Sequence, residues 1–353
     1  MKNHQLTIIA GPDGVDVNNC NAETLIKIAQ LPEVDMVRCV GAKSRTAINS
    51  QTFCGIDYDL IKHNQNIIAD GGSSANFVLT NIDGTPTSLD MAKETYLQTG
   101  KGFATELSGG IIQLLIIQEY IKRNPELIDM PVMIWNPAVD QLANNMDATA
   151  RIVARNGWSL GIKNSHALGE MYSKAESSSY TGESSLEKRI KGMVEIALHN
   201  NVKDIIVLMR GVDIGEKTEQ NMRNVETPYT AMRLGKYFEN TPEVRLGIDH
   251  NHSMGGMQRE GLLSKLKESA IIKINENKYL YDVLLVESVL SPESTSLCDG
   301  DQPLYYDELV ELCNFIKENR NDAIHIRRHS ELDPESPTIE SLISIELSKA
   351  VSF

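Results

Sequence analysis

The chain has 353 residues, is 41% hydrophobic and 23% charged, and carries a formal net charge of −14. This composition is typical of a globular protein with a packed core, and it excludes a fibrous repeat or a disordered chain. The acidic balance argues against nucleic acid and anionic membranes as partners, although a few cations in one cleft still permit a small anionic substrate.

Eight short apolar segments recur along the chain between Gly, Pro, Asn or Asp residues, and each is predicted to be a β-strand. They span residues 6–12, 35–42, 102–108, 131–137, 158–164, 204–211, 243–250 and 282–288. Segments with helical spacing of apolar residues lie between them, at 22–31, 109–123, 138–156, 185–200 and 258–272. The alternation predicts a parallel α/β fold, either a (β/α)8 barrel or a doubly wound open sheet.

Three segments depart from this alternation. Residues 47–101 are long for one crossover and predict an inserted segment after the second strand, and the Ser-rich residues 171–186 predict a loop. Residues 321–353 follow the last predicted barrel helix and form a C-terminal extension. We therefore expect a single domain over 1–353, whose core, a barrel in the first of these two alternatives, spans about 6–320.

The cysteines indicate the compartment. Five are present, none in a CxxC pair, which is typical of a reducing environment, so we expect a cytoplasmic protein. The opening residues contain only a short apolar run, and no later run reaches the length of a membrane span. We expect neither a signal peptide nor a membrane segment.

Every predicted strand has a polar residue near its C-terminal end, where the catalytic residues of barrel enzymes lie. In chain order these are Asp13, Arg38, Glu106, Asn136, Lys163, Arg210, Asp249 and Glu287, with Lys43, Arg45, Thr46, His250, His252 and Asp299 in the segments that follow. For one residue alone a solvated loop or a helix cap is the ordinary interpretation, and the agreement of all eight strands favours a site. Five cations at one mouth require a multiply charged anion, so we expect a phosphorylated substrate.

A histidine and several carboxylates occur beside those cations. His252, Glu287 and Asp299, with Asp13 on the neighbouring first strand, would form a ligand set suited to Mn²⁺, Fe²⁺ or Zn²⁺. His250 is the alternative imidazole, because residues two apart on a strand share a face.

Sequence motifs in these segments resemble those of one enzyme family. IAGPDG resembles IAGPCS, VRCVGAKSRT resembles RGGAYKPRT, GIKN resembles GFKN, and VLMRG resembles LRG. IDHNHS resembles DFSHAN, which selects His252 over His250, and VESVLSPESTSLCDGDQPL resembles IEVHPEPEKALSDGPQQL, the most specific match. From about residue 6 to about residue 316 the chain thus resembles the 3-deoxy-D-arabino-heptulosonate 7-phosphate (DAHP) synthases, with some features of the 3-deoxy-D-manno-octulosonate 8-phosphate synthases.

This resemblance implies a homo-oligomeric (β/α)8 barrel that condenses phosphoenolpyruvate with an aldose phosphate in a metal-dependent reaction. Erythrose 4-phosphate is the first candidate acceptor, which would make this the first step of the shikimate pathway to aromatic amino acids. The implied substrate-binding residues are Arg38, Lys43, Arg45, Thr46, Glu106, Asn136, Lys163 and Arg210. The implied metal ligands are Asp13, His252, Glu287 and Asp299, and the implied catalytic residues are Lys43, His252 and Asp299.

Departures from the family pattern keep alternatives open. Asp13 stands where the family has a cysteine ligand, which favours Mn²⁺ or Mg²⁺ over Zn²⁺ or leaves Asp13 outside the ligand set. Asn136 replaces a family arginine, and Ser44 replaces the proline of KPRT. The alternatives are another aldose acceptor, a non-catalytic barrel that binds a phosphorylated metabolite, and an aldolase with Lys163 as a Schiff-base lysine.

Overall fold

The computed structural model describes residues 7–12, 22–38, 88–107, 110–136, 146–163, 185–210, 231–249, 262–276, 278–290 and 304–320. Residues 47–87 of the predicted insertion, most of the Ser-rich loop and the C-terminal extension lie outside these ranges. All eight predicted strands and all five predicted helices fall at least partly inside them.

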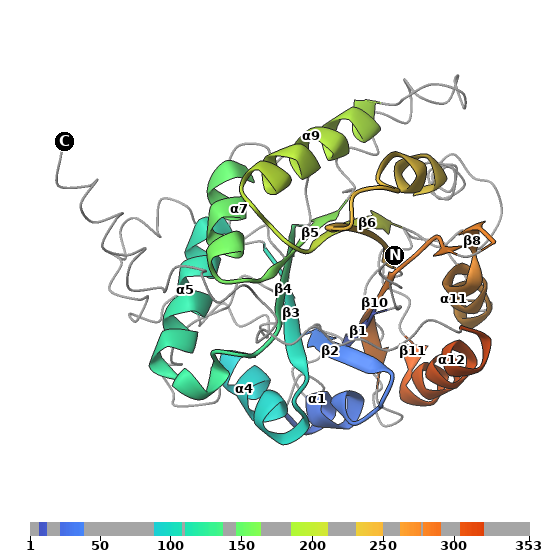
Figure 1. The fold of residues 1–353 in the computed structure, drawn as a ribbon. Helices are drawn as coiled ribbons and strands as arrows, with labels where there is room; N and C mark the ends of the chain where they lie inside the picture. The colour runs from blue at the N-terminus through green and yellow to red at the C-terminus, as the bar shows by residue number, and fades with distance from the viewer. Residues whose placement is uncertain are drawn as a thin grey trace, which may run out of the picture.

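One curled parallel sheet organises the described residues, as Figure 1 shows. Its strands are β1 (Thr7–Pro12), β2 (Val34–Arg38), β3 (Gly102–Glu106), β4 (Val132–Asn136), β5 (Ser159–Lys163), β6 (Ile205–Arg210), β7 (Val244–Asp249), β10 (Val283–Leu290) and the short β11 (Leu304–Tyr305). The eight predicted strands are therefore confirmed. Neighbours in the sheet follow chain order from β1 to β7 and then β10, and β1 also pairs with β10.

This order excludes the doubly wound alternative. A doubly wound sheet starts in its middle and reverses direction at a switch point, where its ligand binds. Here each strand from β2 to β6 pairs with the strand before it and the strand after it. The fold is an α/β fold with a curled parallel sheet, consistent with a (β/α)n architecture.

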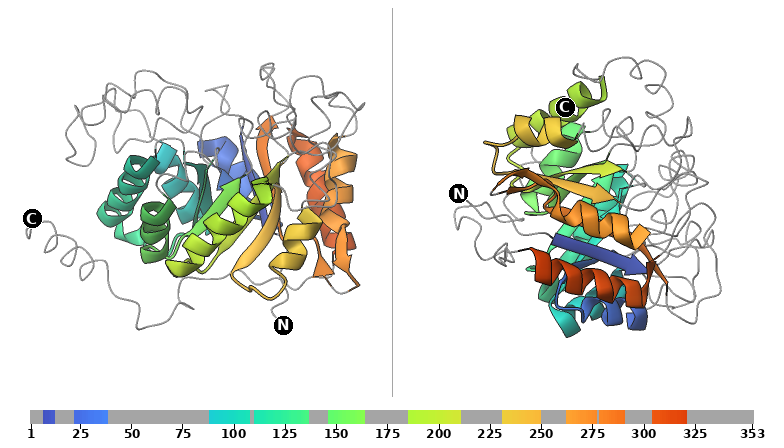
Figure 2. Two further views of the ribbon diagram at one scale, coloured as in Figure 1. Left: turned by 90° about the horizontal axis from the view of Figure 1, so that it is seen from above. Right: turned by 90° about the vertical axis from the view of Figure 1, so that its right-hand side faces the viewer.

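Helices cover the outer face of the sheet (Figure 2). They are α1 (Ala22–Ala29), α4 (Ser88–Thr99), α5 (Gly110–Arg123), α7 (Met146–Arg155), α9 (Ser185–His199), α11 (Leu262–Ile271) and α12 (Tyr306–Asn319), and residues 231–237 are also helical. A 3-10 turn, η3 (Pro125–Leu127), follows α5, and β8 (Lys273–Asn275) pairs antiparallel with β9 (Lys278–Tyr279). Within the described ranges, no helix combines the length and the apolar character needed to cross a membrane.

Helix α4 lies inside the segment that the sequence predicted to be inserted, yet it forms a regular crossover between β2 and β3. It is tied to the next crossover, because Tyr120 of α5 donates a hydrogen bond to Asp90 of α4 at 2.5 Å. Lys93 of α4 also contacts Asn124 and Glu126, each at 2.6 Å. Residues 88–99 therefore continue the strand and helix alternation.

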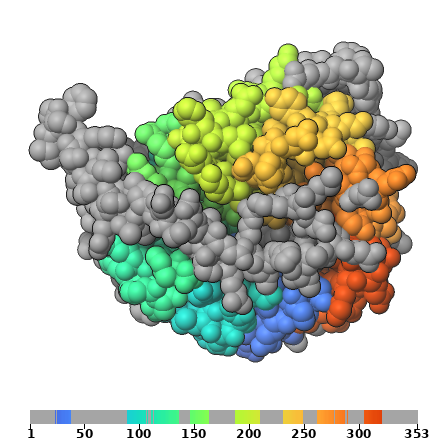
Figure 3. All heavy atoms as spheres, in the orientation of Figure 1, coloured from blue at the N-terminus to red at the C-terminus, as the bar shows by residue number. Residues whose placement is uncertain are grey.

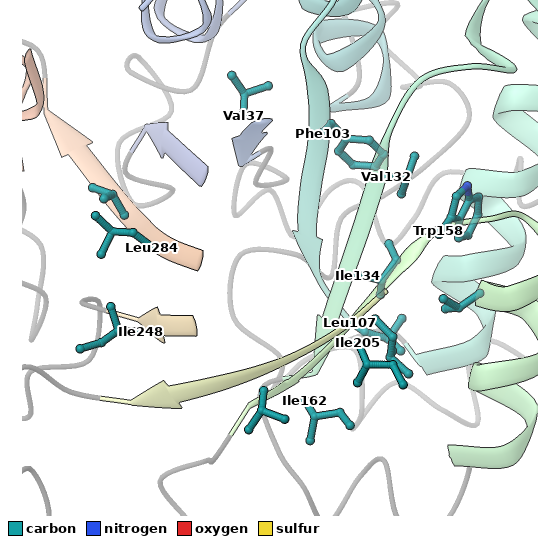
Figure 4. Packing of buried hydrophobic residues seen from close by; sticks show 14 of the residues in the cluster. Val37, Phe103, Leu107, Val132, Ile134, Trp158, Ile162, Ile205, Ile248 and Leu284 are labelled. Carbon is teal, nitrogen blue, oxygen red and sulfur yellow. The ribbon is translucent and has the colours of Figure 1, made fainter. Parts of the chain in front are cut away.

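Two separate apolar clusters flank the sheet because successive side chains of a strand point to opposite faces. The outer cluster packs between the strands and the helices, and Figure 4 shows part of it, including Phe103, Ile134 and Leu284. The inner cluster consists of Met36, Ala104, Met133, Trp135, Ile206, Leu208, Val283 and Leu285. A sheet with an apolar cluster on each face explains why the strand sequences are apolar at consecutive positions.

A glycine makes room for the largest side chain of the inner cluster. A Cβ atom added to Gly161 of β5 would lie 2.4 Å from the Cβ of Trp135 on neighbouring β4. Real side chains do not approach so closely, so position 161 requires glycine as long as Trp135, which is fully buried, occupies the interior.

Candidate functional site

The C-terminal ends of the parallel strands form one edge of the sheet, and this edge is the candidate site. The backbone of six predicted substrate- and metal-binding residues lies at or near this edge. Arg38 ends β2, Glu106 ends β3, Asn136 ends β4, Lys163 ends β5, Arg210 ends β6, and Glu287 lies in β10. Asp249, which ends β7, completes the series. The fold thus brings to one edge residues that are separated by up to 249 positions in the chain.

Strand register places the charges of this edge in a definite order. Lys163 pairs with Leu208, so Arg210 lies two residues further along the neighbouring strand. From the spacing of strands and the rise per residue, the two Cα atoms are about 8 Å apart. A phosphate group that meets two cations is held better than one that meets a single charge.

Acidic residues follow on the next strands. Arg210 pairs with Asp249 of β7, and Asp249 pairs in turn with Leu285, two residues before Glu287 on β10. Two cationic strand ends, on β5 and β6, therefore stand beside two acidic positions, on β7 and β10. This segregation suits a reaction that binds an anion and a divalent cation side by side.

Of the four predicted metal ligands, the described residues include only Glu287, in β10. Pro12, which directly precedes Asp13, pairs with Val289 of β10, and His252 follows shortly after the end of β7. One imidazole and three carboxylates are, by their chemistry, a donor set that fits Mn²⁺ or another oxygen-preferring divalent ion. Asp13, Lys43, Arg45, Thr46, His250, His252 and Asp299 themselves lie outside the described residues.

The two-residue alternation separates Asn136 from the other edge positions. Positions 38, 106, 210 and 287 each lie two residues beyond an inner-cluster residue, which are Met36, Ala104, Leu208 and Leu285 respectively. Position 136 instead continues Val132 and Ile134, which belong to the outer cluster. On β4 the inner position nearest the edge is occupied by Trp135, a residue that the sequence analysis did not select.

Beneath the edge the interior is closed by apolar side chains. Trp135, Leu208 and Leu285 are fully buried, and every member of the inner cluster is apolar. Buried apolar side chains lower the local dielectric constant, which strengthens charge interactions at the edge above them.

The opposite edge, where the strands begin, carries a separate charged cluster. Arg245 of β7 donates two hydrogen bonds to Asp204, at 2.8 and 2.7 Å, and Ser159 of β5 donates a third, at 2.6 Å. Burial alone would lower the pKa of Arg245, but the carboxylates of Asp204, Asp282 and Asp35 raise it above its ordinary value. Because these bonds join β5 and β7 through the residue that precedes β6, we assign this cluster to stability. No sequence motif pointed to this cluster.

Comparison of the chain with protein-family models and with curated protein sequences found no match.

Proposed function

We propose that the chain condenses phosphoenolpyruvate with an aldose phosphate on a (β/α)8 barrel, with erythrose 4-phosphate as the first candidate acceptor and DAHP and phosphate as products. The observation that carries this proposal is the order of charges at the C-terminal edge: Lys163 and Arg210 on adjacent strands, followed by Asp249 and Glu287 on the next two. The identity of the substrates is inferred from the resemblance of the sequence motifs.

Strand pairing supports the barrel part of the proposal. β10 pairs in parallel with β7 on one side and with β1 on the other, through five register partners in β1. An open sheet would leave β1 without a second neighbour, whereas a barrel has no edge strand.

In the proposed complex, each of the two anionic groups of phosphoenolpyruvate is bound by two cations. Lys163 and Arg210 bind its phosphate, and Arg38 and Lys43 bind its carboxylate, which holds the enol carbon toward the aldehyde. Because both ends of the molecule are fixed, the binding energy offsets much of the entropy lost in bringing the enol carbon to the aldehyde.

The acceptor occupies the remaining part of the edge. Arg45 and Thr46 bind its phosphate, and Glu106 completes the substrate-binding set, whereas Asn136 continues the outer face of β4 and is left out of this set. Asp13, His252, Glu287 and Asp299 would hold a divalent ion, which would supply Lewis acidity for the aldehyde carbonyl.

The chemistry balances with one water. The methylene carbon of phosphoenolpyruvate forms a bond to the aldehyde carbon, water adds at the carbon that bears phosphate, and the carbon–oxygen bond to phosphate breaks. Cationic residues stabilise the leaving phosphate, and the aldehyde oxygen takes up a proton to become a hydroxyl group. The products are the seven-carbon keto sugar phosphate and inorganic phosphate.

An aldose panel tests the proposal. The purified chain is incubated with phosphoenolpyruvate and each of erythrose 4-phosphate, arabinose 5-phosphate, ribose 5-phosphate and the free sugars, with Mn²⁺ or with a chelator. Loss of enol absorbance and release of phosphate at equal rates, with Mn²⁺ only, are expected for the true acceptor. Consumption of phosphoenolpyruvate with none of these aldoses would refute the catalytic assignment.

A matched pair of variants tests the site. Arg210→Met and Lys203→Met each remove one cation near β6, the first at its C-terminal end and the second just before its N-terminal end. We expect Arg210→Met to lower kcat/KM for phosphoenolpyruvate by about 100-fold, because a hydrogen bond to a charged group contributes up to about 3 kcal/mol. Lys203→Met should stay within about twofold of the wild type. Equal effects would mean that the C-terminal edge does not bind the substrate.

A non-catalytic barrel that binds a phosphorylated metabolite is the second candidate function. It is favoured by Asp13 and Asn136, which replace a family cysteine and a family arginine. Tight Mn²⁺ binding that His252→Ala and Glu287→Ala abolish, with no turnover of any aldose, would select this candidate over the enzyme.

A further inference from the structure

A buried carboxylate joins two consecutive crossovers on the outer layer. Glu187, the third residue of α9, is only 1% exposed, and it accepts a hydrogen bond from Nε of Arg233 at 2.5 Å. Arg233 belongs to the helical residues 231–237, which lead into β7. The two partners are 46 positions apart in the chain, so the contact arises only in the folded protein.

A second contact one helical turn further along shows that the two helices lie side by side. Nζ of Lys191 lies 3.9 Å from the centre of the Tyr237 ring, and each residue is four positions beyond a member of the ion pair. Figure 3 shows residues 185–210 and 231–249 in contact on the surface. Tyr237 is 52% exposed, whereas Glu187 is buried, so the ion pair is the better protected of the two contacts.

The ion pair is placed toward the candidate site. Residues 200–204 connect the C-terminal end of α9 to the start of β6, so the first turn of α9, which holds Glu187, is the end nearer the C-terminal edge. In chain order, α9 is the crossover that follows Lys163, and the helix at 231–237 is the crossover that follows Arg210.

We propose that Glu187, through Arg233, is a positioning residue for the phosphate-binding cations of the C-terminal edge. Strand pairing sets the distance between Lys163 and Arg210, and the ion pair, which fixes the crossover after β5 against the crossover after β6, adds a second restraint that holds the two strand ends at that distance for one phosphoryl group. The inference rests on the proposed binding of phosphoenolpyruvate. Its physical basis is that two cations share an anion only within narrow limits of position, and displacements of about 1 Å weaken such sites strongly.

The test compares ligand binding with stability in four proteins. Binding of phosphoenolpyruvate is measured by calorimetry and unfolding by thermal melting, for the wild type, Glu187→Gln, Lys191→Met and Asp204→Asn. Lys191→Met removes the exposed contact of the same interface, and Asp204→Asn removes a charge from the opposite edge, near the start of β6.

Glu187→Gln should raise the Kd of phosphoenolpyruvate by about tenfold, because the amide keeps the size of the side chain but loses the charge that holds Arg233. Lys191→Met should leave Kd within about twofold, and Asp204→Asn should lower Tm without changing Kd. If Glu187→Gln does not fold, Arg233→Lys, which keeps the charge and loses the planar fork, should raise Kd in the same direction.

Two results overturn the inference in distinguishable ways. A folded Glu187→Gln or Arg233→Lys protein that binds phosphoenolpyruvate with the wild-type Kd removes the positioning role and leaves the proposed function intact. A wild type that binds no phosphoenolpyruvate removes the proposed function itself, and the positioning role with it.

Discussion

Loss of Arg245 should destabilise the fold far more than loss of a surface arginine in the same kind of ion pair. Arg245 donates two charged hydrogen bonds to Asp204, and the two side chains are only 16% and 21% exposed. Removing one partner of a buried pair costs about 3 to 5 kcal/mol, because the other charge stays desolvated. Since both side chains keep some solvent contact, we expect Arg245→Met to lower the free energy of unfolding by about 3 kcal/mol.

This value translates into a measurable shift of Tm. An unfolding entropy of roughly 2.1 cal/mol/K per residue gives about 0.7 kcal/mol/K for a chain of 353 residues, so Tm should fall by about 4 °C. Urea unfolding followed by circular dichroism supplies the free energy, and scanning calorimetry supplies Tm. A double-mutant cycle with Asp204→Asn isolates the pair, with an expected coupling of about 2 kcal/mol.

Arg151 provides the matched control. It pairs with Asp147 on α7 at 2.7 Å, the distance found between Arg245 Nη2 and Asp204, but these side chains are 51% and 60% exposed. Arg151→Met should therefore cost less than about 0.5 kcal/mol. If the two arginine variants have the same stability, burial of the Arg245 pair does not govern its strength, and the reasoning is refuted.

Three further predictions test packing and burial. In urea unfolding, Gly161→Ala should destabilise the fold by about 2 kcal/mol, since the new Cβ would overlap Trp135. The control is Gly192→Ala, whose Cβ meets no atom within 4 Å. It should stabilise α9 by about 0.5 to 1 kcal/mol. Thr105→Val should be neutral or stabilise by up to about 1 kcal/mol, because the buried Thr105 hydroxyl has no hydrogen-bond partner in the described ranges; a loss above about 1 kcal/mol would contradict this. Burial raises the pKa of the Cys313 thiol to about 12, so iodoacetamide at pH 8 should leave Cys313 unmodified in the native protein and modify it in denaturant, as peptide mass mapping would show.

Local sequence patterns determined the eight strands and the polar residues at their ends. Each strand is a short apolar run between turn-forming residues, and both signals act over a few positions. The residues at the C-terminal edge followed from one rule, that parallel strands place their C-terminal ends together. Helix α4 was not predicted because polar and charged residues interrupt its apolar positions, and its place is set by contacts with α5, such as that between Asp90 and Tyr120.

Only the tertiary structure decided which distant residues meet. The pairing of β1 with β10, the fit of Trp135 against Gly161, and the ion pairs of Arg245 with Asp204 and Arg233 with Glu187 join positions that are far apart along the chain. No spacing in the sequence encodes them, because each depends on how the whole sheet curls. The sequence by itself therefore determined which residues stand at the strand ends, and the curled sheet decided their neighbours and what holds them in place.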